Sequence, residues 1–223
     1  PEVLTLAENY PNVYAAVGVH PNSSAAWEPS WLDQVRRFAK NPRVVAIGEI
    51  GLDYYWDDSP KEVQQIAFSS QLDLAVDLEL PVIIHNREAS DDVIKLLADS
   101  RLAGRERPGV LHSFSAEWRI AEAALEMGFY IGLTGPVTFK KADDLRQVVA
   151  KLPLNRILVE TDAPFLAPQR RRGKRNEPSY VTYIAEQIAA LHELSSEEMA
   201  SITTANARRL FGPKLNHGDG ADD

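Results

Sequence analysis

Short apolar runs alternate with amphipathic segments along most of the chain. Runs rich in small and β-branched residues predict buried strands at residues 13–19, 44–50, 82–85, 109–112, 129–133 and 156–160. Helical periodicity predicts helices at residues 2–10, 30–40, 60–80, 91–100, 116–127, 142–151, 180–192 and 196–211. None of the strands alternates apolar and polar residues, so we expect each to be buried on both faces, as in a parallel sheet.

Regular alternation of strand and helix predicts an α/β fold, and both a doubly wound sheet and a (β/α)₈ barrel fit it. No repeat or linker divides the chain, so we expect one domain over residues 1–211 and a disordered polar tail at 212–223. The helix at 60–80 has a recognisable start. Ser59 is expected to cap it, with Pro60 at the first helical position and Glu62 completing a capping box.

The amino-acid composition excludes several kinds of functional site. The 223 residues include no cysteine, which excludes disulfides, thiolate metal sites and cysteine nucleophiles. No run approaches the roughly 18 apolar residues of a membrane helix, and the chain does not open on a signal-peptide pattern. A cytoplasmic protein with no membrane partner is therefore expected. The net charge of −8 argues against general coating of nucleic acid but allows a local basic site.

Histidines and carboxylates gather where the predicted strands end. Glu49 lies near the end of the second strand, His85 and His112 end the third and fourth, and Asp162 follows the sixth. In a parallel barrel these ends face one rim, and such side chains suit Zn²⁺, Mn²⁺ or Mg²⁺. A single histidine there is more often a hydrogen-bonded loop residue. A buried carboxylate such as Glu49 needs a cation, a salt bridge or several hydrogen bonds.

Longer motifs carry a family resemblance. They are, in order, Val17-Gly18-Val19-His20-Pro21, Gly48-Glu49-Ile50-Gly51-Leu52-Asp53-Tyr54-Tyr55, Pro81-Val82-Ile83-Ile84-His85-Asn86-Arg87, His112-Ser113-Phe114-Ser115, Glu160-Thr161-Asp162-Ala163-Pro164 and Arg172-Gly173-Lys174-Arg175-Asn176-Glu177-Pro178. With these motifs the chain resembles the TatD family of metal-dependent deoxyribonucleases over about residues 10–211. The resemblance implies a TIM-type (β/α)₈ barrel.

The resemblance also implies roles for the residues at the strand ends. Glu49 would bridge two divalent metal ions, Mg²⁺, Mn²⁺ or Zn²⁺, and His85 and His112 would complete the protein ligands of one ion. Asp162 would bind the other ion and orient or deprotonate the attacking water. Two metal ions roughly 3.5–4 Å apart can polarise a phosphodiester and stabilise its leaving oxygen.

Several positions depart from the family pattern. The chain has no His-x-His pair, and its first strand matches the third strand of the family. We therefore expect an N-terminally incomplete barrel that lacks the first two strands and binds about one metal ion. The family's His-Pro-His, Ser-Arg-Asp and His-x-Phe-Ser-Gly become His20-Pro21-Asn22, Asn86-Arg87-Glu88 and His112-Ser113-Phe114-Ser115-Ala116. These local changes are expected to affect substrate contacts.

Candidate substrate contacts lie near these motifs. Arg172, Lys174 and Arg175 belong to a basic cluster that could hold phosphates on an otherwise acidic protein, although such clusters are often only solvated. Arg87 could bind a phosphate through two hydrogen bonds, or form a salt bridge with a nearby carboxylate. His20 could contact a phosphate or the leaving group, or serve only in a structural hydrogen bond. The aromatic run 54–56 could stack on bases, although packing beneath its loop is the simpler expectation.

Three functions remain in competition. The first is metal-dependent hydrolysis of DNA phosphodiester bonds, with single strands or ends as substrate. The second is hydrolysis of a small cyclic amide, lactone or phosphoester by the same type of barrel, which would not require the basic residues if the substrate is neutral. The third is a non-catalytic truncated barrel. The sequence leaves the oligomeric state open.

Overall fold

A computed structural model describes residues 2–212 and 215. The chain divides into two compact units. Unit 1 comprises the residues up to Val110 together with those from Arg208 onward, and unit 2 comprises Leu111–Ala207. The predicted tail lies, apart from Gly212 and Leu215, outside the described residues. Within the part of the chain that is described, no helix has the length and apolar character needed to cross a membrane.

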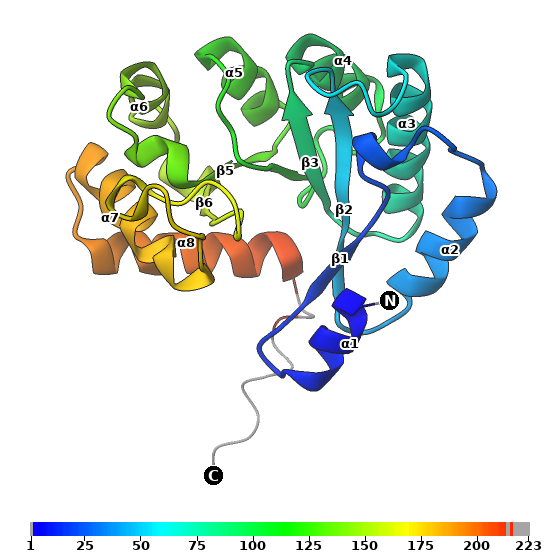
Figure 1. Cartoon of the computed structure of the whole chain (residues 1–223), viewed down its shortest axis with the longest axis horizontal. Helices are drawn as coiled ribbons and strands as arrows, with labels where there is room; N and C mark the ends of the chain where they lie inside the picture. Colours follow the sequence, from blue (N-terminus) through cyan, green and yellow to red (C-terminus); the bar gives the residue numbers. More distant parts are fainter. Residues whose placement is uncertain (1, 213–214, 216–223) are drawn as a thin grey trace. The chain divides into compact units, whose positions relative to one another are not determined.

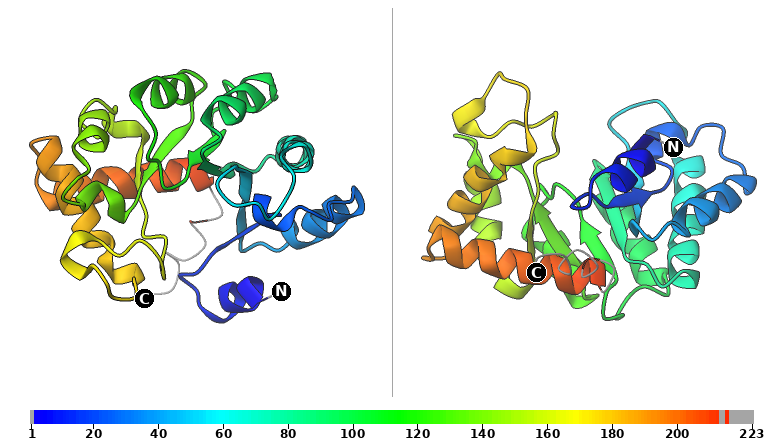
Figure 2. Two further views of the ribbon diagram at one scale, coloured as in Figure 1. Left: turned by 45° about the horizontal axis from the view of Figure 1, so that its top comes forward. Right: turned by 90° about the horizontal axis from the view of Figure 1, so that it is seen from below.

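Unit 1 contains parallel strands flanked by helices. Its strands are β1 (Ala15–Val17), β2 (Val44–Asp53) and β3 (Val82–Arg87), with β4 (Gly109–Leu111) at the unit boundary. Its helices are α1 (Glu2–Asn9), α2 (Ser30–Ala39), α3 (Lys61–Asp77) and α4 (Ser90–Asp99), with a 3₁₀ turn η1 (Pro21–Ser23) after β1. Strand β2 pairs in parallel with both β1 and β3. Helices α2 and α3 pack side by side against β2 (Figures 1 and 2).

Unit 2 repeats the alternation of strand and helix. It contains α5 (Trp118–Glu126), β5 (Tyr130–Leu133), α6 (Asp143–Val149), β6 (Ile157–Val159), α7 (Val181–Leu191) and most of α8 (Ser196–Phe211). Its 3₁₀ turns are η2 (Gly135–Thr138), η3 (Leu154–Arg156), η4 (Gln169–Arg171) and η5 (Pro178–Tyr180). Strands β5 and β6 pair in parallel. Helix α7 packs against η2 and β6.

The strands follow one another in the sheet in sequence order, from β1 to β6. The predicted parallel α/β architecture is therefore confirmed. Burial explains why these segments form strands: Ile47, Ile50 and Leu52 on β2 and Ile131 on β5 are 0% exposed. Full burial of each such side chain contributes about 1.5–3 kcal/mol. In β2, Glu49 is the one residue that is not fully buried.

Strand β2 continues three residues beyond the predicted end at Ile50, and this extension carries it past the candidate site. Gly51 pairs with His85 of β3 and has a φ of 142°. A Cβ atom at Gly51 would collide with the backbone carbonyl of His85. Only glycine allows this close approach. The pairing then runs on to Asp53, which lies opposite Arg87.

The start of α3 differs from the prediction. The helix begins at Lys61, Pro60 stands at the N-cap, and no side chain caps the helix. The expected capping box is wrong because Ser59 is buried and its hydroxyl forms no hydrogen bond in the described structure. Two buried glutamines of α3 hold the strand ends instead. Gln64 bonds the N–H and C=O groups of Asp53, and Gln71 bonds those of Val19.

Candidate metal centre

A cluster of histidines and carboxylates lies at the ends of the unit 1 strands. We call His20, Glu49, Asp53 and His85 the Glu49 cluster. The Nδ1 atom of His85 lies 2.7 Å from Oε1 of Glu49, and Nε2 of His20 lies 3.9 Å from the same oxygen. One ligand atom from each of His20, Glu49 and His85 lies within 4.8 Å of the others. This spacing brings the three side chains close enough to act on one bound group.

Asp53 fixes the orientation of His85. Its Oδ2 atom lies 2.9 Å from Nε2 of His85, while Oδ1 accepts the backbone N–H groups of Tyr55 and Trp56. Burial tends to raise the pKa of Asp53, but the hydrogen bonds from Trp56, His85 and Tyr55 outweigh it and hold that pKa below its usual range. Burial likewise tends to lower the pKa of His85, but Glu49 and Asp53 outweigh it and raise that pKa. Asp53 is therefore an ionised anchor for the imidazole.

His20 differs from His85 in how its ring is held. The backbone N–H of Asn22 donates to Nδ1 of His20 across 3.2 Å. Nδ1 is therefore the acceptor, and in the neutral ring the proton lies on Nε2, which faces Glu49. A protonated Nε2 is a hydrogen-bond donor and cannot bind a metal ion. The ring is positioned through the preceding residue, Val19, whose N–H and C=O are held by Gln71.

Unit 2 contains a similar arrangement, which we call the His112 cluster: His112, Glu160 and Asp162. The Nδ1 atom of His112 lies 2.7 Å from Oε2 of Glu160, and Nε2 lies 3.3 Å from Oδ1 of Asp162. The N–H of Ser113 also donates to Glu160. The Glu160 carboxylate lies where a side chain at Gly132 would be, so Gly132 makes room for it. In both clusters, two carboxylates flank one imidazole.

The donor sets of both clusters fit a divalent cation. Imidazole nitrogens and carboxylate oxygens bind Zn²⁺ and Mn²⁺, and carboxylates also suit Mg²⁺. A histidine that binds metal usually donates its other ring N–H to a carboxylate. Asp53 satisfies this for His85, which leaves Nδ1 toward Glu49, and Glu160 satisfies it for His112, which leaves Nε2 toward Asp162.

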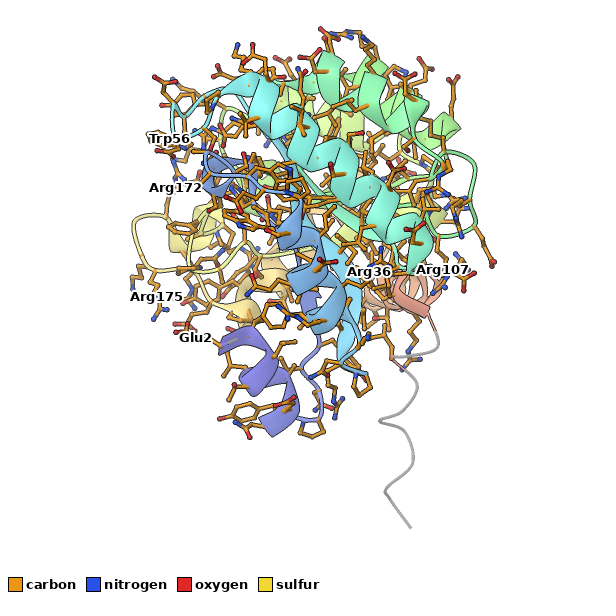
Figure 3. The ribbon with its side chains drawn as sticks, turned by 90° about the vertical axis from the view of Figure 1, so that its right-hand side faces the viewer. Glu2, Arg36, Trp56, Arg107, Arg172 and Arg175 are labelled. Atoms are coloured by element: carbon orange, nitrogen blue, oxygen red, sulfur yellow. The ribbon has the colours of Figure 1, made fainter. Side chains whose placement is uncertain are left out.

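The structure places the predicted substrate contacts in different surroundings. Arg87 is exposed, and its Cζ atom lies 4.0 Å from the ring centroid of Tyr55. Arg172 stacks over Phe139 at the same distance. Lys174 and Arg175 are exposed in the loop before η5, and Figure 3 shows Arg175 projecting from that loop.

Sequence reasoning missed two carboxylates and two glutamines of the site: Asp53, Glu160, Gln64 and Gln71. Asp53 and Glu160 both lie inside the family motifs, and in space they lie 2.9 Å and 2.7 Å from the predicted ligands His85 and His112. The signal that could have found them is the rule that ligating histidines carry a carboxylate partner. The glutamines gave no such signal, since only the packing of α3 shows that they reach the strand ends.

Comparison with known proteins agrees with this geometry. Residues 1–212 match the family model described as TatD related DNase. The chain is 47% identical over 209 residues to an uncharacterized metal-dependent hydrolase, YabD, of Bacillus subtilis, and the match covers 93% of this chain and 81% of YabD. It is 38% identical over 216 residues to the 3'-5' ssDNA/RNA exonuclease TatD of Salmonella typhimurium, covering 94% and 82% of the two chains.

Among solved structures, the TatD homologue YJJV from Escherichia coli aligns with a TM-score of 0.87 at 36% identity, covering 94% of this chain and 81% of YJJV. The solved TatD homologues are TIM-type barrels, which confirms the predicted fold class. The family model, the relatives and the two imidazole–carboxylate clusters all agree with the resemblance seen in the sequence motifs. The chain therefore belongs to the TatD family of metal-dependent hydrolases.

Proposed function

We propose that this hydrolase cleaves phosphodiester bonds of DNA, acting on single strands or ends. The observation that carries the proposal is the Glu49 cluster, in which Nδ1 of His85 lies 2.7 Å from Glu49 and Nε2 of His20 faces the same carboxylate. Further support comes from the exposed cations Arg87, Lys174 and Arg175 on a protein of net charge −8. A phosphodiester substrate explains such local cations, whereas a neutral lactone or cyclic amide does not.

The metal ligands in this proposal are Glu49 and His85 in unit 1, and His112 and Asp162 in unit 2. A bound divalent cation would supply Lewis acidity toward the phosphate and lower the pKa of a bound water. Asp53 and Glu160 hold the ring N–H groups of the two histidines. This keeps each imidazole in the tautomer that leaves its other nitrogen available.

Two further residues act on the substrate and on water. His20 donates its Nε2–H to a phosphate oxygen or to the leaving oxygen, because Asn22 already occupies its Nδ1 atom. Asp162 orients the attacking water and accepts its proton. The left-handed backbone at Asp162, with a φ of 57°, is unusual for a residue other than glycine and is frequent at functional sites.

The test is hydrolysis of end-labelled single-stranded DNA by the purified chain with Mg²⁺, Mn²⁺ or Zn²⁺, and with a chelator. Duplex DNA, single-stranded RNA, a lactone and a phosphotriester are parallel substrates. His85→Ala should lower divalent-dependent DNA cleavage at least about tenfold, because loss of a ligand removes both metal affinity and catalysis. His192→Gln is the matched control, since within the described residues the His192 side chain bonds only the carbonyl of Val149. Cleavage of the small substrates but not of DNA would replace the proposal with the alternative.

A further inference from the structure

The loop between β2 and α3 exposes two large aromatic side chains next to the Glu49 cluster. Tyr55 is 49% exposed and Trp56 is 51% exposed. Their ring centroids are 4.8 Å apart, with the ring planes perpendicular. Figure 3 shows Trp56 on this loop. The expected packing beneath the loop applies to Tyr54, which is half-buried, but not to these two rings. Adjacent exposed aromatic rings commonly mark a binding surface.

Arg87 adds a cation to the two rings. Its Cζ atom lies 4.0 Å from the centroid of Tyr55 and 5.6 Å from that of Trp56. In the described part of the chain, its guanidinium forms no ion pair and no hydrogen bond. A guanidinium that stacks through its face keeps its in-plane N–H groups available, and these match the geometry of a phosphate.

The same residues that hold the candidate ligands hold this loop. Asp53 accepts the N–H groups of Tyr55 and Trp56 on one oxygen and contacts His85 through the other. The N–H of Tyr54 donates to the carbonyl of Arg87, which lies two residues after His85 on β3. The aromatic pair and Arg87 are therefore fixed at the strand ends that present Glu49 and His85.

A hollow of about 220 Å³ lies against the aromatic pair, lined by Asp53, Tyr54, Tyr55, Trp56, Ser59 and Lys61 among others. It is smaller than the roughly 300–1,000 Å³ of drug-sized ligand sites, and suits part of a ligand such as one planar ring. Ser59 is only 5% exposed, and its hydroxyl has no hydrogen-bond partner in the described structure. Lys61 lies 4.3 Å from the ring of Tyr54 and adds positive charge.

We propose that Tyr55, Trp56 and Arg87 form a subsite that stacks one base of a single-stranded nucleic acid and holds an adjoining phosphate. The inference rests on the proposed function and specifies how the substrate is recognised. Aromatic rings beside a cation are the usual means of binding unpaired bases without sequence preference. A duplex keeps its base faces stacked inside the helix, so this subsite favours single strands or frayed ends.

The test compares Trp56→Ala with Trp56→Phe on two substrates of equal length: a single-stranded DNA oligonucleotide and its abasic counterpart. Trp56→Ala should raise KM for the DNA about 5- to 100-fold with kcat within about twofold, and Trp56→Phe should restore most of the loss. On the abasic chain, Trp56→Ala and wild type should have equal KM. Tyr10→Ala is the control, since Tyr10 is 57% exposed at the end of α1. Circular dichroism verifies that each variant folds.

Equilibrium binding separates this inference from the proposed function. The dissociation constant of a fluorescently labelled oligonucleotide, measured in chelator, should rise by the same factor in Trp56→Ala, and Arg87→Gln should lower the log–log salt slope by about 0.7. If wild type cleaves no nucleic acid, the proposed function fails, and this binding comparison still decides on the subsite. An unchanged KM or dissociation constant in Trp56→Ala, or an equal loss on the abasic chain, overturns the subsite.

Discussion

The carboxylate of Asp53 lies 2.9 Å from Nε2 of His85, on the side of the ring opposite to Glu49. Asp53 is 1% exposed, and both of its carboxylate oxygens are already engaged, one by His85 and one by the loop backbone. Its contribution is therefore to hold the imidazole, and also to hold the loop that carries Tyr55 and Trp56. One buried side chain thus couples the orientation of a candidate metal ligand to the position of the neighbouring aromatic pair.

Asp53→Asn tests this role. The amide keeps the size of the side chain but loses its charge, so the Nε2–H of His85 loses a charge-assisted partner. Metal affinity should fall about 10- to 100-fold, as is typical when the partner of a ligating histidine is changed. Isothermal titration with Mn²⁺ measures it. Asp99→Asn on α4 is a control for an exposed carboxylate, and its metal affinity should match that of wild type. If Asp53→Asn binds Mn²⁺ as tightly as wild type, Asp53 serves only to hold the loop.

Much of the site could be predicted because the sequence alone shows which residue types stand at the ends of the apolar runs. Glu49 interrupts an apolar run, and His85 and His112 end two others, so each stood out without a structure. Asp53 did not, because the predicted strand stopped at Ile50. The continuation depends on Gly51 approaching the backbone of His85, which is a property of the β2–β3 pair and not of either run alone.

Ser59 illustrates a different limit of prediction from sequence. Its spacing from Glu62 matches a capping box, but the structure starts α3 after Pro60 and buries the Ser59 hydroxyl. The carbonyl of Ser59 instead accepts a hydrogen bond from Gln64, which also holds Asp53. Long-range packing of the helix against β2 therefore outweighed the local capping preference, and no local pattern reports such packing.

Gln71→Met should destabilise the protein. Gln71 is 1% exposed and bonds both the N–H and the C=O of Val19, next to His20. Methionine fills the space but leaves these groups unpaired, at a cost of about 1–3 kcal/mol for each buried group that finds no water. Urea unfolding measures the change. Gln65→Met on the same helix is the matched control, because Gln65 bonds side chains and no backbone group. Equal losses in the two variants would contradict the anchoring role.

Tyr54 should make stability fall at alkaline pH. Burial and then the acceptor Asp92 raise the pKa of Tyr54 to about 12, from its usual value of 10.0. Below the unfolded pKa the phenol is protonated in both states, so its contribution is fully present. As pH rises from about 10 to about 12, the unfolded chain ionises first and the folded state loses that stability. The pKa is measured by titrating tyrosinate absorbance against pH in wild type and in Tyr54→Phe, because the difference between the two curves reports Tyr54. Asp92→Asn should lower it, and an unshifted value there would exclude Asp92 as a cause.

The basic loop after β6 should divide into structural and phosphate-binding residues. Arg170 pairs with Glu186 at 2.9 Å, and Arg171 donates to the hydroxyl of Tyr183. Within the described residues, the side chains of Lys174 and Arg175 form no such bond, and both are exposed. The buried Asn176 ties this end of the loop to the backbone on either side of Asp162, through the carbonyls of Thr161 and Phe165. The loop that carries the two exposed cations is therefore attached next to Asp162, a candidate metal ligand.

Replacing both Lys174 and Arg175 by Gln should weaken binding of single-stranded DNA and lower its log–log salt slope by about 1.4, since each phosphate contact contributes about 0.7. Metal content, measured by mass spectrometry, should stay unchanged because neither side chain is a ligand. Arg171→Gln should instead reduce thermal stability, because it removes the bond to Tyr183 and the stacking on Tyr180. Lys95→Gln on α4 controls for loss of charge at a distance from the loop in sequence. A salt slope for the double variant equal to that of Lys95→Gln would show that the loop is only a solvated surface, and the phosphate contacts would then have to come from Arg87 and Lys61.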